Sequence, residues 1–87
     1  MKSNSILKSA ILKVVDNQLK DINPPETKQT FDRLIKEGMP ENEAKRLIGC
    51  VVATEIFDVL KNKEEFNHKR FVEALNKLPE IPWKEKQ

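Results

Sequence analysis

The fold is decided by the stretch from Ala44 to Leu60, which reads AKRLIGCVVATEIFDVL. Its apolar residues recur at helical spacing, and they fall on two faces of the helix instead of one. The first face holds Ala44, Leu47, Ile48, Val51, Val52 and Val59, and the second holds Gly49, Ala53, Ile56 and Leu60, with Cys50 and Phe57 at its edge. A helix that is apolar almost all round is covered by neighbours on several sides. We therefore expect this segment at the centre of the domain.

Prolines and capping residues divide the rest of the chain into helices on either side of this segment. The expected helices span residues 4–21, 25–37, 40–61 and 67–78. The Pro-Pro pair at 24–25 ends the first helix, and Gly38 is the expected left-handed stop of the second. Asn67 is the expected N-cap of the fourth helix, and Phe66 and Phe71 have the spacing of a hydrophobic staple around it.

The chain closes with residues 79–87, which contain two prolines and read as an extended segment. We expect Ile81 and Trp83 to pack across the bundle, and the last four residues to fray. With 87 residues, the chain is long enough for one domain and too short for two. The prediction is therefore a single all-α domain, 1–87, with a four-helix bundle-like fold and a central third helix.

The composition argues against several kinds of functional site. There are 16 basic and 14 acidic residues, so the net charge is +2, and the basic residues are scattered evenly along the chain. One Cys and one His leave no internal disulfide, no cysteine-based zinc site and no pair of histidine ligands. Two Gly leave no glycine-rich phosphate loop. We expect no metal and no cofactor.

Two polar residues interrupt the apolar stripes. Gln18 falls in the apolar face of the first helix, and Glu55 falls in the main face of the third. A buried carboxylate needs partners, which Gln18 or one of Arg33, Arg46 and Arg70 could supply. One interpretation is a hydrogen-bonded core network that sets the helix register, and the other is an interior ligand or catalytic site around Gln18 and Glu55.

The second apolar face of the central helix suggests an interface. Gly49 and Ala53 are four residues apart and form a smooth patch, which Phe57 and Leu60 extend. The patch fits tight core packing, and it also fits a surface for a second copy or another protein. The candidate interface residues are Gly49, Ala53, Phe57 and Leu60.

No pattern along the chain indicates an enzyme. Cys50 lies mid-helix among apolar residues, and His68 lies in an exposed first turn, so both have simple structural interpretations. A site assembled only by folding stays open, because residue spacing does not test it. A helix-turn-helix reading would use an apolar third helix as its recognition helix, which disfavours nucleic-acid binding.

The location is expected to be cytoplasmic. No apolar run is long enough to span a membrane, and Lys8 and Lys13 interrupt what would be the core of a signal peptide. A lone cysteine fits a reducing compartment.

Several segments also carry a resemblance to a known family. They are Asn23-Pro24-Pro25-Glu26-Thr27, Arg33-Leu34-Ile35-Lys36-Glu37-Gly38, Glu43-Ala44, Ala53-Thr54-Glu55-Ile56 and the stretch from Phe66 to Trp83. In this order they resemble a family of small bacterial and archaeal helical proteins of unknown function. The resemblance implies the same helix order and adds no activity. Its members often carry histidines and a Glu in the first and third helices, whereas this chain has Glu55 and no histidine there.

Taken together, these features predict a small, non-catalytic interaction or structural module that associates with itself or with an unidentified protein. The alternative is a ligand-binding protein or enzyme with a polar interior site at Gln18 and Glu55.

Overall fold

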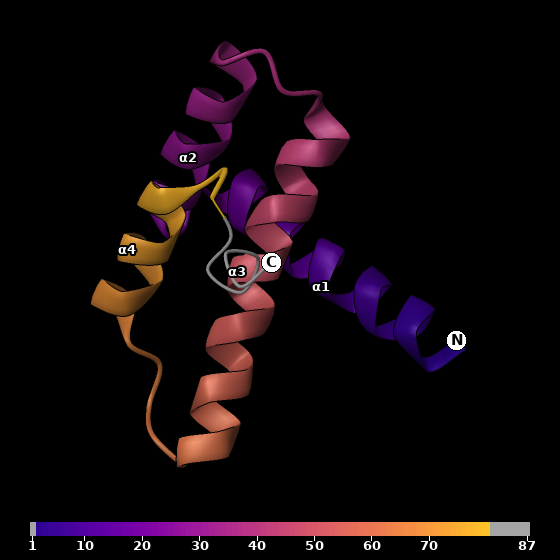
Figure 1. Cartoon of the computed structure of the whole chain (residues 1–87), viewed down its shortest axis with the longest axis vertical. Coiled ribbons are helices and arrows are strands. Elements are labelled where there is room, and N and C mark those ends of the chain that lie inside the picture. Colours follow the sequence, from indigo (N-terminus) through magenta and orange to yellow (C-terminus); the bar gives the residue numbers. More distant parts are fainter. Residues whose placement is uncertain (1, 81–87) are drawn as a thin grey trace.

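The computed structural model describes residues 2–80, with side chains from Leu7 onward. Within this range the chain forms four α-helices and no strand (Figure 1). They are α1 (Lys2–Asp21), α2 (Pro25–Lys36), α3 (Glu41–Asn62) and α4 (His68–Lys77). The predicted all-α, four-helix fold is confirmed, and each predicted boundary lies within two residues of the observed one.

The second and third helices are joined by a tight turn. α2 ends at Lys36, and Gly38 adopts a left-handed φ of 99°. Gly38 N donates to Ile35 O (2.9 Å), and Met39 N donates to Leu34 O (3.0 Å). This pair of bonds satisfies the last carbonyls of α2, and it is the C-capping arrangement that glycine favours. The predicted stop at Gly38 is confirmed.

The start of α4 follows the predicted capping pattern. The Asn67 side chain accepts a hydrogen bond from Arg70 N at 2.9 Å, which satisfies a free donor of the first turn. The rings of Phe66 and Phe71 are 5.5 Å apart, so the staple around this cap is formed.

The end of α4 is held by an arginine from α2. Arg33 Nη1 donates to Leu78 O (2.9 Å), and Arg33 Nη2 donates to Leu75 O (3.1 Å). A cation at a helix C-terminus satisfies free carbonyls and complements the helix dipole. Arg33 is therefore a cap for α4 and not a partner of Glu55.

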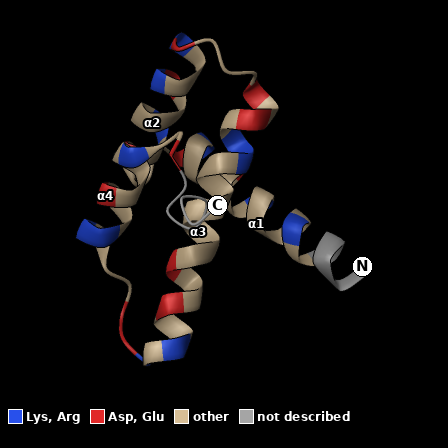
Figure 2. Cartoon of the chain, in the orientation of Figure 1, with Lys and Arg blue, Asp and Glu red and all other residues tan. Residues whose placement is uncertain are grey.

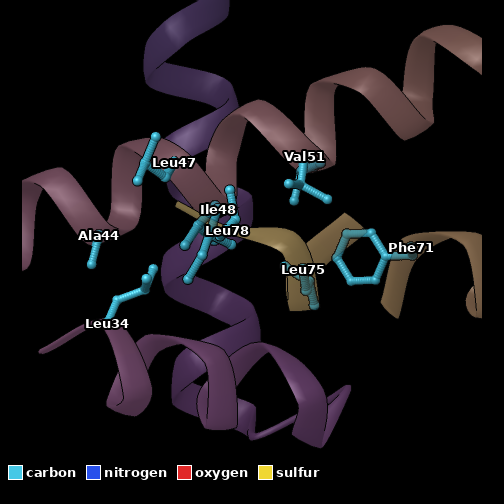
Figure 3. Packing of buried hydrophobic residues seen from close by; sticks show 10 residues of the cluster. Leu34, Ala44, Leu47, Ile48, Val51, Phe71, Leu75 and Leu78 are labelled. Atoms are coloured by element: carbon cyan, nitrogen blue, oxygen red, sulfur yellow. The ribbon is translucent and has the colours of Figure 1, made fainter. Parts of the chain in front are cut away.

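α3 contributes more buried core residues than any other helix, and like α2 it contacts the other three helices. All four helices contribute to one core: Val15, Leu34, Ala44, Leu47, Ile48, Val51, Val52, Phe71 and Leu75, with Leu78 just after α4. Figure 3 shows Val51 of α3 pointing toward α4, where Leu75 and Phe71 face it. The first apolar face of α3 is thus the core face, as predicted.

α1 crosses α3 closely and then extends beyond the bundle. Gly49 is buried at the crossing, where an added methyl group would lie 3.2 Å from Ile11 Cγ2. Asp16 and Lys45 form an ion pair of 3.0 Å between the two helices. The first half of α1 projects away from the other helices (Figure 1), and Leu7 on it is exposed.

Residues of both charge signs are spread over the described helices (Figure 2). The predicted packing of Ile81 and Trp83 falls on residues outside the described range, so it stays a prediction, as does the fraying of the last four residues.

Candidate functional site

Glu55 is the buried charge that the helical wheel indicated. It is only 5% exposed, on the core face of α3. Arg70 Nε donates to Glu55 Oε1, and Arg70 Nη2 donates to Glu55 Oε2, both at 2.9 Å. The backbone N–H of Asn67 also donates to Glu55 Oε2 at 2.9 Å. One carboxylate therefore binds the fork of an arginine and the start of the same helix.

This arrangement keeps Glu55 ionised. The hydrogen bonds from Arg70 hold the pKa of Glu55 below its usual value, and the Asn67 N–H acts in the same direction, against the opposing effect of burial. The pair raises the pKa of Arg70, which also binds Glu64 at 3.2 Å. A carboxylate with three donors and a depressed pKa is a poor proton acceptor, so its geometry is that of a structural ion pair.

Gln18 is bonded to a residue of α2 and not to Glu55. Its Oε1 accepts a hydrogen bond from Thr27 Oγ1 at 2.9 Å, and Thr27 is fully buried. Of the candidate partners that the sequence offered for Glu55, Arg70 is bonded to it and Gln18 is not: the two carboxylate oxygens accept from Arg70 and from the Asn67 N–H. The short turn after α1 brings α2 back beside Gln18 instead. Gln18 therefore links α1 to α2.

Gln18 and Glu55 nevertheless line one groove between α1, α3 and the start of α4. Its volume is about 310 Å³. The other lining residues are apolar: Val14, Val52, Ile56, Val59, Leu60, Phe66 and Phe71. The groove is thus mainly apolar, with two polar residues in its wall. The carboxylate oxygens of Glu55 and Oε1 of Gln18 accept hydrogen bonds from within the protein.

The four candidate interface residues separate into two groups. Gly49 is buried against α1 and belongs to the core. Ala53 is half-buried, whereas Phe57 and Leu60 are 68% and 70% exposed. The core interpretation therefore holds for Gly49, and Phe57 and Leu60 lie on the surface of α3.

The exposed apolar surface is larger than the candidate set. Ile56 is 43% exposed and Phe66 is 55% exposed, and both border the same groove as Leu60. Ile56 could have been included from the sequence, because it shares the second face of the helix. Phe66 could not, since the staple accounted for its ring and did not indicate how much of it stays exposed.

A second groove lies where α1 crosses α3, with a volume of about 330 Å³. It is lined by Leu7, Lys8, Ile11, Leu12, Arg46, Gly49, Cys50 and Ala53. Its wall contains the only cysteine of the chain. Burial raises the pKa of the Cys50 thiol, which favours its protonated form.

His68 lies in the first turn of α4 and is exposed, as expected. Its Nε2 is 3.5 Å from Glu26 Oε2, while Glu26 Oε1 is buried without a hydrogen-bond partner. Across residues 2–80 no group of three or more His, Cys, Asp or Glu side chains could hold a metal ion. None of the helices in this range is long and apolar enough to cross a membrane.

Comparison with known proteins adds no relative to this description. No family model, no curated protein and no solved structure matches the chain.

Proposed function

We propose that this chain is a non-catalytic interaction module of the cytoplasm, which binds a protein surface through the second half of α3. The observation that carries the proposal is the exposure of Phe57 and Leu60, two large apolar side chains in the body of a helix. A contiguous exposed apolar surface on a small domain is a mark of an interaction site. The adjoining groove, with Ile56 and Phe66 on its border, gives this surface a shape that can receive side chains.

The polar groups support a structural role. Glu55 is held by Arg70 and the Asn67 backbone, and Gln18 is held by Thr27. Burial raises the pKa of Cys50. Glu55 and Gln18 are therefore engaged, and Cys50 favours its protonated form, which favours binding over catalysis at these three positions.

Photo-cross-linking from the proposed surface tests this function. A benzophenone side chain replaces Phe57 in one variant and Ile35, an exposed apolar residue of α2, in the control. In the native cells, we expect defined protein adducts from position 57 and none in comparable yield from position 35. Equal labelling from both positions would contradict the proposal.

A second candidate function is the binding of a small apolar ligand in the groove lined by Gln18 and Glu55, favoured by its volume of about 310 Å³. Val14→Phe would fill the groove from α1. If an apolar ligand is the natural occupant, native mass spectrometry should detect it on the wild-type protein and not on this variant.

A further inference from the structure

We propose that the occupant of the exposed face of α3 is a second copy of this chain, paired antiparallel along the stripe formed by Ala53, Ile56, Phe57 and Leu60. This inference rests on the proposed function and names its partner. The four residues recur at spacings of three, one and three along α3. That is the spacing of the seam between two packed helices.

The stripe is complementary to itself only in one direction. A twofold axis between Ile56 and Phe57 sets Ile56 level with Phe57 of the second copy, and Ala53 level with its Leu60. A small side chain then faces a large one at both ends of the stripe, as close packing requires. A parallel pair would set Ala53 against Ala53 and Phe57 against Phe57, which leaves a gap in one place and crowding in another.

Lys61 beside the stripe favours the same direction. In the antiparallel alignment it is level with the uncharged Val52 of the second copy, whereas in a parallel alignment it would be level with Lys61 of the second copy, and like charges would oppose each other. The carboxylates favour neither direction, because Asp58 is level with Glu55 of the second copy in the antiparallel pair and with Asp58 in a parallel one. The stripe itself contains no charged residue.

The exposed area is sufficient for a reversible dimer. Val14, Ile56, Phe57, Leu60 and Phe66 are between 36% and 70% exposed. Together they present on the order of 400 Å² of apolar surface. Since about 60% of a typical interface is apolar, this corresponds to about 700 Å² per copy. A standard interface buries about 800 Å² per partner, so this area lies in the lower part of the standard range.

Sedimentation equilibrium of the purified full chain tests the pairing. The wild-type protein should show a concentration-dependent monomer–dimer equilibrium. Ile56→Lys should raise the dissociation constant at least about tenfold, because it places a charge at the centre of the seam. Ile35→Lys is the matched control, with the same residue change at a similarly exposed site on α2, and it should leave the equilibrium unchanged. Equal weakening by both variants would overturn the proposal.

Disulfide trapping tests the direction of the pairing. Ala53→Cys and Leu60→Cys are made separately in a Cys50→Ser background, mixed and oxidised. The antiparallel alignment predicts the mixed disulfide well above its statistical share, because a disulfide requires Cα atoms within about 7 Å. A predominance of either homodimer would overturn the antiparallel arrangement.

The outcomes separate this inference from the proposed function. If the wild-type protein sediments as a monomer at every concentration while position 57 cross-links a different protein in cells, the second copy is wrong and the interaction module stands. If position 57 captures nothing beyond the control and the protein is a monomer, both proposals fail.

Discussion

The two faces of the second half of α3 differ in the kind of side chain that they bury: one buries a charged residue, and the other exposes a large apolar one. Glu55 is 5% exposed, and Phe57, two residues later on the same helix, is 68% exposed. The buried charge is stable because Arg70 and the Asn67 N–H replace the water that it loses. Phe57, in contrast, keeps most of its surface exposed in the part of the chain that the structure describes. Polarity alone therefore does not identify the inner face of a helix; the partners that other helices bring to it do.

The largest expected effect on stability comes from truncating a core residue of α3, which we compare with truncation of an exposed apolar residue on its other face. Ile48→Ala on the core face should lower the free energy of unfolding by about 3 kcal/mol, because it leaves a cavity among buried neighbours. Phe57→Ala removes a larger side chain and should cost about 0.5 kcal/mol or less in the dilute monomer. Urea unfolding followed by far-UV circular dichroism measures both. A comparable loss in the two variants would show that Phe57 is covered within the monomer.

The next effect concerns the charge on the core face. Glu55→Gln keeps the shape of the side chain and removes its charge. It should cost about 2 kcal/mol, less than a fully buried pair would, because the Arg70 side chain is 35% exposed. Asp58→Asn is the control on the same helix, where the carboxylate lies 3.9 Å from Arg70 Nε. It should cost less than about 0.5 kcal/mol. Equal costs would mean that the bidentate geometry adds nothing.

Acid should weaken the same contact without a mutation. The pKa of Glu55 lies below the ordinary value of 4.5 in the folded state, so the unfolded chain binds the proton more readily. The contribution is fully present above the unfolded pKa, and it is lost as pH falls through the folded pKa. Unfolding free energies measured from neutral pH into this acid range should therefore fall more steeply for the wild-type protein than for Glu55→Gln. Parallel curves would contradict the assignment.

The smallest of these effects concerns the N-cap beside Glu55. Asn67→Ala should cost about 1 kcal/mol, because the Arg70 N–H loses its side-chain acceptor. Asn76→Ala, on the exposed side of the same helix, should be neutral or slightly stabilising, since alanine is the better helix former. Thermal unfolding of the two variants checks the difference.

The helices and their ends were predictable because local signals specify them. Gly38 and Asn67 act on backbone groups within a few residues, and a single sequence contains everything that they need. The burial of Glu55 was also predictable, since it follows from the core face of one helix. The sequence offered four possible partners for Glu55, namely Gln18, Arg33, Arg46 and Arg70, and in the structure the partner is Arg70.

The arrangement between helices could not be read in the same way. A bond between Gln18 and Glu55, one of the options that the sequence left open, depended on the register between α1 and α3, and the α1–α2 turn instead brings Thr27 to Gln18. Among the described residues, the second face of α3 is covered where α1 crosses it, around Gly49. Phe57 and Leu60 lie beyond that crossing. A helical wheel shows which residues share a face of α3, but it does not show over what length of α3 a neighbouring helix covers that face.

The hydrogen bonds that hold the two ends of α4, from Glu55 and from Arg33, also suggest an order in which the chain folds. The contacts of Glu55 with Asn67 and Arg70 span 12 and 15 residues, whereas those of Arg33 with Leu75 and Leu78 span 42 and 45. Closing a loop about three times longer costs about 1 kcal/mol more in chain entropy. We therefore expect α3 and α4 to form a nucleus around Glu55, which α2 completes later through Arg33. In stopped-flow experiments, Glu55→Gln should slow folding, and Arg33→Ala should mainly accelerate unfolding.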